Sequence, residues 1–273
     1  MYRGCTNSMV SIKIYPSAKN GQEKKPAIIG MPGFVGTLEG GRIEKLFKEF
    51  AYNGVICIGM MYDGIEHQGN KVICNFNINT YIKNMQEAFE MISRMPNVDT
   101  NRIGVMASSI SGAVFAYGLA DNRTAGINPR SYVAISPLVA WQYYKTPEFR
   151  AGAEHAIKAG IKKDLIITSV YDAKRGIERV LPLSCLKGIE KVDGLRELES
   201  YSPNGMEVMT LVGCLDDTSS PESMRKYHEQ LGGKPEDLVN FEMEGHAIDF
   251  NKMRVPVTSF LERTLGIHHS VVV

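Results

Sequence analysis

The chain has 273 residues, a length that suits one large α/β domain and is enough to bury a sizeable core. Its 31 basic and 30 acidic residues give a net charge of +1, which argues against nucleic acid or another polyanion as a partner. No apolar run approaches the ~18 residues of a membrane span, and the N-terminus lacks the basic and apolar regions of a signal peptide. We therefore expect a soluble, cytoplasmic protein that makes no membrane contact.

Five cysteines occur at irregular spacing. Cys57 and Cys214 lie in apolar, strand-like runs, where cysteine is more often a small hydrophobic residue than a reactive one. An odd number of cysteines in an intracellular chain favours reduced thiols over a disulfide framework. No cluster of His, Cys and carboxylate residues has the spacing of metal ligands, so we expect no metal site and no cofactor.

The N-terminal half alternates between strand and helix patterns. Residues 9–15 alternate apolar and polar side chains, whereas residues 55–60 form the continuous apolar run of a central parallel strand. Residues 66–70 are expected to form a polar loop. The predicted elements are strands at 9–15, 27–31, 55–60 and 131–135 and helices at 43–51 and 81–92. This alternation predicts an α/β fold with a mostly parallel central sheet and helices on both faces.

A strand pattern turns directly into a helix pattern within residues 102–116. Between the two apolar runs lie only small residues around a central serine, Ala107-Ser108-Ser109-Ile110-Ser111. A sharp strand-to-helix turn exposes one hydroxyl at its apex and needs small residues two positions before and after it. The usual form is G-x-S-x-G, so this is a relaxed version. Ser108 and Ser111 are rivals in the same turn, but the register from the preceding strand favours Ser109 as the nucleophile.

The alternation is interrupted between about residues 137 and 204. The aromatic residues there, which include Trp141, Tyr143 and Tyr144, are candidates either to line an acyl pocket or to pack the insertion onto the core. We therefore divide the chain into a core of residues 1–137 and 204–273 and an inserted lid of residues 138–203. Further predicted elements are helices near 148–161, 186–199, 221–231 and 256–265 and strands at 165–170, 207–212 and 238–243.

An acid and a histidine follow the last two predicted strands, at Asp216 and His246. The carboxyl ends of parallel strands meet at one edge of a sheet, so these side chains are expected to lie beside Ser109. Serine needs a base to become nucleophilic, and the base needs an acid to orient it. The chain order Ser, Asp, His supplies all three groups.

Alternatives exist for the acid and the histidine. Asp217 is the other candidate acid, but the spacing from Gly213 favours Asp216. The remaining histidines lack a comparable context and are expected to be solvated: His67, His155, His228, His268 and His269.

An acyl-transfer intermediate needs two preorganised N–H donors for its oxyanion. We expect them from the backbone of Ile110, directly after the nucleophile, and of Phe34, in the loop after the strand at 27–31. Gly33 would let the backbone approach closely there. The glycines of this loop have neither the dinucleotide nor the P-loop spacing, which argues against a phosphate site.

These motifs resemble the α/β-hydrolases, and within them the small serine esterases of the cinnamoyl/feruloyl-esterase-like (dienelactone-hydrolase-like) group. The resemblance covers nearly the whole chain and is carried by Pro32-Gly33-Phe34, Arg102 to Gly112, Gly213-Cys214-Leu215-Asp216, Pro221-Glu222 and Gly245-His246. It implies an α/β-hydrolase fold with an inserted lid and a catalytic triad of Ser109, Asp216 and His246. Two positions depart from the group's pattern: Pro32 replaces a histidine, and Ser111 replaces a glycine.

The sequence therefore predicts a serine hydrolase that cleaves a carboxylic ester of a small molecule through an acyl-enzyme on Ser109. A thioesterase, an amidase or peptidase, or an acyltransferase would use the same three residues. The departures at Pro32 and Ser111 fit such a specialised role. A non-catalytic protein that binds a small ligand in the lid cavity is the alternative from another class. The oligomeric state, monomer or homodimer, is left open.

Overall fold

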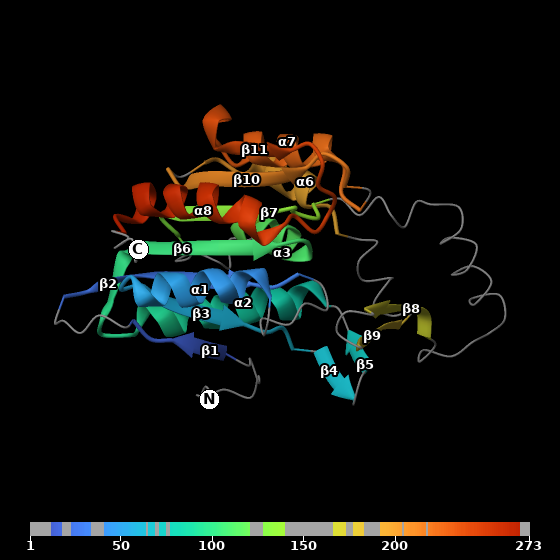
Figure 1. The fold of residues 1–273 in the computed structure, drawn as a ribbon, viewed down its shortest axis with the longest axis horizontal. Coiled ribbons are helices and arrows are strands. Elements are labelled where there is room, and N and C mark those ends of the chain that lie inside the picture. The colour runs from blue at the N-terminus through green and yellow to red at the C-terminus, as the bar shows by residue number, and fades with distance from the viewer. Residues whose placement is uncertain are drawn as a thin grey trace.

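A seven-stranded sheet forms the centre of the molecule (Figure 1). The computed structural model describes residues 12–17, 23–33, 41–63, 65–68, 71–74, 77–120, 128–139, 166–172, 177–182, 192–203, 205–216 and 218–267. The strand order is β1-β3-β2-β6-β7-β10-β11, in which β1 runs antiparallel to β3 and the other neighbours pair in parallel. The strands are β1 (Ile12–Tyr15), β2 (Lys25–Met31), β3 (Ile56–Met60), β6 (Val98–Ser108), β7 (Ser131–Ile135), β10 (Glu207–Gly213) and β11 (Leu238–Phe241).

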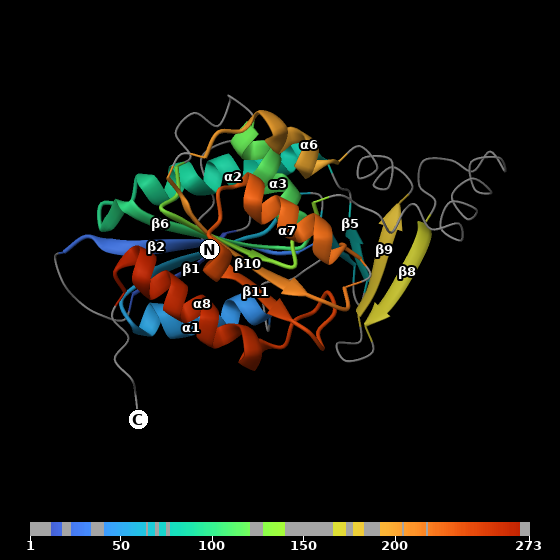
Figure 2. The ribbon, with the colours of Figure 1, turned by 90° about the horizontal axis from the view of Figure 1, so that it is seen from above.

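Helices cover both faces of this sheet (Figure 2), as the sequence predicts. One face carries α1 (Arg42–Tyr52) and α8 (Phe250–Leu265), and the other carries α2 (Ile78–Ser93), α3 (Ile110–Ala120) and α7 (Pro221–Gln230). Ile28 of β2 packs in the core with Phe47 and Leu261, whereas its neighbour Ile29 packs in the opposite core with Phe115. Successive residues enter different cores because side chains alternate across a strand. Short helical turns are α6 (Gly194–Glu197), η3 (Leu198–Ser200) and η4 (Pro235–Asp237).

A second, four-stranded sheet lies beyond the end of β3 (Figures 1 and 2). Its strands, in the order β4-β5-β9-β8, are β4 (Ile65–Gln68), β5 (Lys71–Cys74), β9 (Ile177–Pro182) and β8 (Ile166–Asp172). β9 comes from the predicted lid and pairs in parallel with β5, which lies in the segment assigned to the core. The division into core and lid stays a prediction, because residues 140–165 and 183–191 lie outside the described residues.

Three elements differ from the sequence predictions. Residues 66–70 were expected to form a loop, but 65–68 form β4, because pairing with β5 supplies the backbone hydrogen bonds of a strand whatever the polarity of the side chains. The last helix begins at Phe250 rather than Pro256, because the Asp249 side chain caps it by accepting from the Asn251 N–H. Within the predicted helix at 186–199, the described residues form only α6 and the start of η3. The helix expected near 148–161 lies outside the described residues.

His228 is 2% exposed, so the expectation that it is solvated is wrong. It lies one helical turn after Met224 and beside Tyr227, on the face of α7 that packs toward the sheet. Its ring nitrogens find hydrogen-bond partners there, which makes the burial of a polar ring tolerable.

Two further expectations concern thiols and membranes. Cys57 and Cys214 form no disulfide in the described part of the chain. Cys57 is fully buried, and burial raises the pKa of its thiol, as expected for a structural cysteine. No helix among the described residues combines the length and apolar character needed to span a bilayer.

Candidate active site

Ser109 occupies the sharp turn between β6 and α3, with φ of 55°. A serine in this left-handed region carries strain, which persists only where the surroundings enforce it. The Ser109 N–H donates to the Ile135 carbonyl at 3.0 Å, and its own carbonyl accepts from the N–H groups of Gly112 at 2.9 Å and Leu138 at 2.8 Å. These bonds tie the turn to the carboxyl end of β7 and fix the direction of the Ser109 side chain.

The neighbours of the turn are small because backbone passes close to it. Ala107 and Ser111, two residues before and after Ser109, are both fully buried. A Cβ on Gly33 would lie 3.2 Å from the Cβ of Ser109, so the loop after β2 runs directly against the turn at Ser109. A larger residue at position 33 would push that loop away from Ser109.

His246 lies on the loop after β11 and meets Ser109 across the sheet edge. Its Nε2 lies 2.8 Å from Ser109 Oγ. The loop is held beside the one after β10, since the Leu215 N–H donates to the Glu244 carbonyl at 2.9 Å and any Cβ on Gly213 would collide with Gly245. This contact lets two loops approach closely enough to bring the histidine to the serine.

Asp216 lies behind His246 on the loop after β10. Its Oδ2 lies 2.8 Å from His246 Nδ1, and its Oδ1 accepts from the backbone N–H groups of Thr218 at 2.8 Å and Ser219 at 3.0 Å. The Asp216 side chain is fully buried, whereas 28% of the His246 side chain is exposed. An ionised carboxylate only accepts, so Nδ1 carries the hydrogen and Nε2 is left to accept from the Ser109 hydroxyl.

The arrangement is therefore a hydrogen-bonded chain from a buried carboxylate through a partly exposed imidazole to a serine hydroxyl. Such a chain can move the serine proton onto Nε2 and stabilise the resulting imidazolium. The Ile110 N–H, at the first position of α3, makes no backbone hydrogen bond to any described residue. It is therefore available as a donor beside Ser109.

The structure brings Ser109, His246 and Asp216 together and shows why the rival Ser111 is unsuited to attack a substrate. Ser111 is fully buried, and its hydroxyl is engaged by Tyr62 and by the Pro32 carbonyl. Ser108 is half-buried at the end of β6. The remaining predicted site residues and the alternative acid lie outside the described residues: Phe34, Trp141, Tyr143, Tyr144 and Asp217.

One residue near the site escaped the sequence analysis. Tyr62 comes after β3 at the same edge of the sheet as the other three groups and contacts Ser111. Asp216 and His246 stand out in the sequence because each comes just after a strand, and the same criterion applied to β3 would have led to Tyr62.

The sheet order, the strained serine turn and the loops that bring the acid and the histidine together define the α/β-hydrolase fold. No protein-family model matches the sequence, and no match is found among curated proteins. Solved structures do resemble the chain over nearly its whole length. Eight of them, at 12–19% identity, show the fold, and the chemistry has to be argued from this chain's own residues.

Three of these structures illustrate the likeness. Est1E from Butyrivibrio proteoclasticus, solved with ferulic acid bound, is 19% identical, with a TM-score of 0.67 and coverage of 97% of this chain and 99% of that one. DcsB, solved with a substrate analogue, is 15% identical, with a TM-score of 0.71 and coverage of 96% and 97%. Acetyl xylan esterase 1 from Thermoanaerobacterium sp. JW/SL YS485 is 16% identical, with a TM-score of 0.58 and coverage of 93% and 78%.

Proposed function

We propose that this protein is a serine hydrolase that cleaves a carboxylic ester of a small molecule through an acyl-enzyme on Ser109. The observation that carries the proposal is the continuous chain of hydrogen bonds, each 2.8 Å long, from Asp216 through His246 to Ser109. A strained turn presents the serine at the head of this chain. Strain held in place at a nucleophile is typical of sites that perform chemistry.

In the first half of the reaction Ser109 Oγ attacks the ester carbonyl while His246 Nε2 removes its proton. Asp216 holds the imidazole in the tautomer that accepts at Nε2 and stabilises the positive charge that forms. His246 then donates the proton to the leaving alcohol, and the acyl group remains on Ser109. Water repeats the sequence with His246 as base and releases the acid.

The oxyanion that forms during each attack needs N–H donors already in place. The Ile110 N–H serves as one donor in this proposal, which its lack of a backbone partner among the described residues supports. We assign the second donor to the Phe34 N–H, since the loop that leads to it passes against Ser109 at Gly33.

The substrate class is inferred from similar proteins and from the sequence. A protein with ferulic acid bound and an acetyl xylan esterase share this fold over most of the chain, which supports an ester of a small molecule. We assign residues 138–203 to a lid over the site, with Trp141, Tyr143 and Tyr144 as substrate contacts. These lid assignments rest on the sequence pattern.

The test is reaction with a fluorophosphonate probe, with the adduct mapped by mass spectrometry. Wild-type protein should be labelled at Ser109, Ser109→Ala should not be labelled, and His246→Ala should react at least about 10³-fold more slowly. Ser131→Ala is the matched control, because Ser131 is a buried serine whose hydroxyl has no hydrogen-bond partner in the described part of the chain. A wild-type protein that is not labelled would contradict the proposal. If it is labelled at Ser109, a panel of esters, thioesters and amides identifies the type of bond that it cleaves.

A further inference from the structure

The two positions that depart from the usual pattern, Pro32 and Ser111, touch each other. The Ser111 hydroxyl donates to the Pro32 carbonyl oxygen and lies 2.5 Å from the Tyr62 hydroxyl oxygen. Ser111 is fully buried, Tyr62 is 3% exposed and Pro32 is buried. These residues join the first turn of α3, the segment after β3 and the loop after β2, so the contact links three separate parts of the sheet edge.

The direction of the hydrogen bonds follows from the chemistry of the groups. A carbonyl oxygen only accepts, so the single hydrogen of Ser111 goes to Pro32. The Tyr62 hydroxyl must then donate to Ser111 Oγ. We call this chain, from Tyr62 through Ser111 to the Pro32 carbonyl, the hydroxyl relay. A glycine at position 111 would leave both the Tyr62 hydroxyl and the Pro32 carbonyl without these partners in a buried site, which is costly.

Tyr62 is itself held in place by α2. Its ring stacks on Tyr81, with centroids 3.8 Å apart and planes 1° from parallel. The next residue, Asp63, is fixed twice by the fully buried Asn84: its N–H donates to Asn84 Oδ1 at 2.8 Å, and Asn84 Nδ2 donates to its Oδ2 at 2.9 Å. Tyr81 and Asn84 are three residues apart and lie on the same face of α2. The relay therefore begins from a rigid point.

The other end of the relay lies beside the nucleophile. Pro32 has no N–H, so its carbonyl is the backbone group through which the loop can be fixed at that residue. Gly33 comes directly after it and passes against Ser109. The proposed second oxyanion donor, Phe34, is the next residue in the sequence. The position of the Pro32 peptide relative to Ser109 therefore influences where the Phe34 N–H lies.

We propose that Ser111 and Tyr62 are positioning residues: the hydroxyl relay holds the Pro32–Gly33 segment against the nucleophile turn, so that oxyanion stabilisation depends on it. This inference rests on the proposed function of Ser109. It also explains why Pro32 and Ser111 depart from the usual pattern together, because the Ser111 hydroxyl holds the loop that contains Pro32.

The test compares Ser111→Ala and Tyr62→Phe with matched controls in steady-state hydrolysis of an activated aryl ester. Ser111→Ala should lower kcat about 10- to 100-fold and leave KM within about threefold, because a displaced oxyanion donor affects the transition state more than the bound ester. Tyr62→Phe, which keeps the Ser111–Pro32 bond and the stacked ring, should lower kcat by less. A general loss of packing would instead lower the melting temperature without this separation of kcat from KM.

The controls are Ser131→Ala and Tyr132→Phe. Tyr132 belongs to a second buried relay, through the Tyr227 hydroxyl at 2.9 Å to the Gly112 carbonyl at 2.8 Å, which does not reach the Pro32 loop. Both control variants should keep kcat within about twofold of wild type. Hydrogen–deuterium exchange of the peptide that contains Pro32 and Gly33 should be faster in Ser111→Ala than in either control.

The outcomes separate the two proposals. If Ser111→Ala and Tyr62→Phe match the controls in kcat and in exchange, the relay is overturned while the hydrolase stands. If wild-type protein is not labelled at Ser109, the proposed function fails, and the exchange measurement still decides whether Ser111 holds the loop. If Ser111→Ala does not fold, Tyr62→Phe decides by the same two measurements.

Discussion

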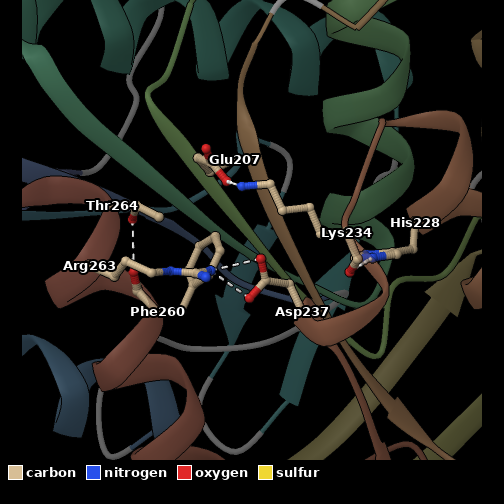
Figure 3. A network of polar contacts seen from close by, with 7 residues as sticks. All are labelled: Glu207, His228, Lys234, Asp237, Phe260, Arg263 and Thr264. Carbon is tan, nitrogen blue, oxygen red and sulfur yellow. Dashed lines mark hydrogen bonds and ion pairs between the residues drawn. The ribbon is translucent and has the colours of Figure 1, made fainter.

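Two histidines of this chain have both ring nitrogens engaged, yet their surroundings give them opposite properties. His246 lies between a carboxylate and a serine hydroxyl, with 28% of its side chain exposed. His228 lies 2.9 Å from the Lys234 carbonyl (Figure 3). Its other ring nitrogen lies 3.0 Å from the Thr210 hydroxyl, and the residue is 2% exposed. The two sites differ in burial and in partners, because His246 contacts a carboxylate whereas both partners of His228 are uncharged.

The partners of His228 fix its state. The Lys234 carbonyl only accepts, so Nε2 carries the hydrogen and Nδ1 accepts from Thr210. Burial lowers the pKa of His228, and this outweighs the opposing effects of the Lys234 carbonyl and of Asp237. Around it, Lys234 pairs with Glu207 and Arg263 pairs with Asp237 (Figure 3). This region joins α7, η4, β10 and α8, so its chemistry serves the fold.

The largest effect is expected when a substitution removes the carboxylate that contacts His246 and has no counterpart at His228. Asp216→Asn should lower kcat about 10³- to 10⁴-fold, because the amide no longer holds Nδ1–H or stabilises the imidazolium. The measurement is steady-state hydrolysis of an aryl ester at pH 7.5. Asp237→Asn is the matched control, since Asp237 is also buried but belongs to the His228 region. Retention of a tenth of the activity by Asp216→Asn would show that His246 does not depend on this carboxylate.

The next largest effect is the loss of stability when each histidine is replaced by alanine, which should be greater at His228 than at His246. His228→Ala should lower the free energy of unfolding by about 2–3 kcal/mol, because it opens a cavity and leaves Thr210 and the Lys234 carbonyl unpaired. His246→Ala should lower it by less than about 1 kcal/mol, because its ring is partly exposed. Urea titration measures both values. Fluorophosphonate labelling of the folded variants should be slowed far more by His246→Ala than by His228→Ala. A similar loss of stability in both variants would contradict the contrast between the two histidines.

The sequence predicts most elements of the core because each is marked by a pattern of residues that are close together in the chain. The strand at 131–135 and the turn at Ser109 are marked by short runs of apolar and small residues, and both are found where expected. The meeting of Ser109, Asp216 and His246 could be predicted because each comes just after a strand of the same sheet. Nothing in this inference required knowledge of a distant contact.

The features that the sequence did not reveal depend on contacts between distant residues. Ser111 was recognised only as a rival nucleophile and as a departure from the usual pattern, because its partners Tyr62 and Pro32 are 49 and 79 residues away. His228 was expected in solvent, because its helix is polar overall and only the packing of α7 shows that its ring faces β10. The start of α8 was missed because a proline is typical of the first turn of a helix, whereas Pro256 lies inside this one.

A smaller effect concerns pH. The pKa of His228 is lower in the folded chain than in the unfolded chain, so on acidification the unfolded chain takes up a proton that the folded chain does not. The contribution of His228 to stability is therefore fully present above the unfolded pKa of about 6.5 and declines as the pH falls below it. His228→Gln should remove this contribution, and its free energy of unfolding should fall less steeply than that of wild type between pH 7 and pH 5. Urea titrations at several pH values measure the two slopes. Parallel slopes would show that His228 does not titrate differently in the two states.

The smallest expected effect tests the ion pair beside His228. Arg263 donates to both Asp237 oxygens, at 2.6 and 2.7 Å, but half of its side chain is exposed, so solvent screens the pair. Arg263→Gln should therefore lower the free energy of unfolding by only about 0.5–1 kcal/mol and leave ester hydrolysis within about twofold of wild type. Arg94→Gln is the control, because its pair with Glu90 lies on an exposed helix surface and should contribute less. Equal losses of unfolding free energy in the two variants would mean that the burial of Asp237 does not strengthen its pair with Arg263. A marked loss of ester hydrolysis in Arg263→Gln would show that the His228 region also supports catalysis.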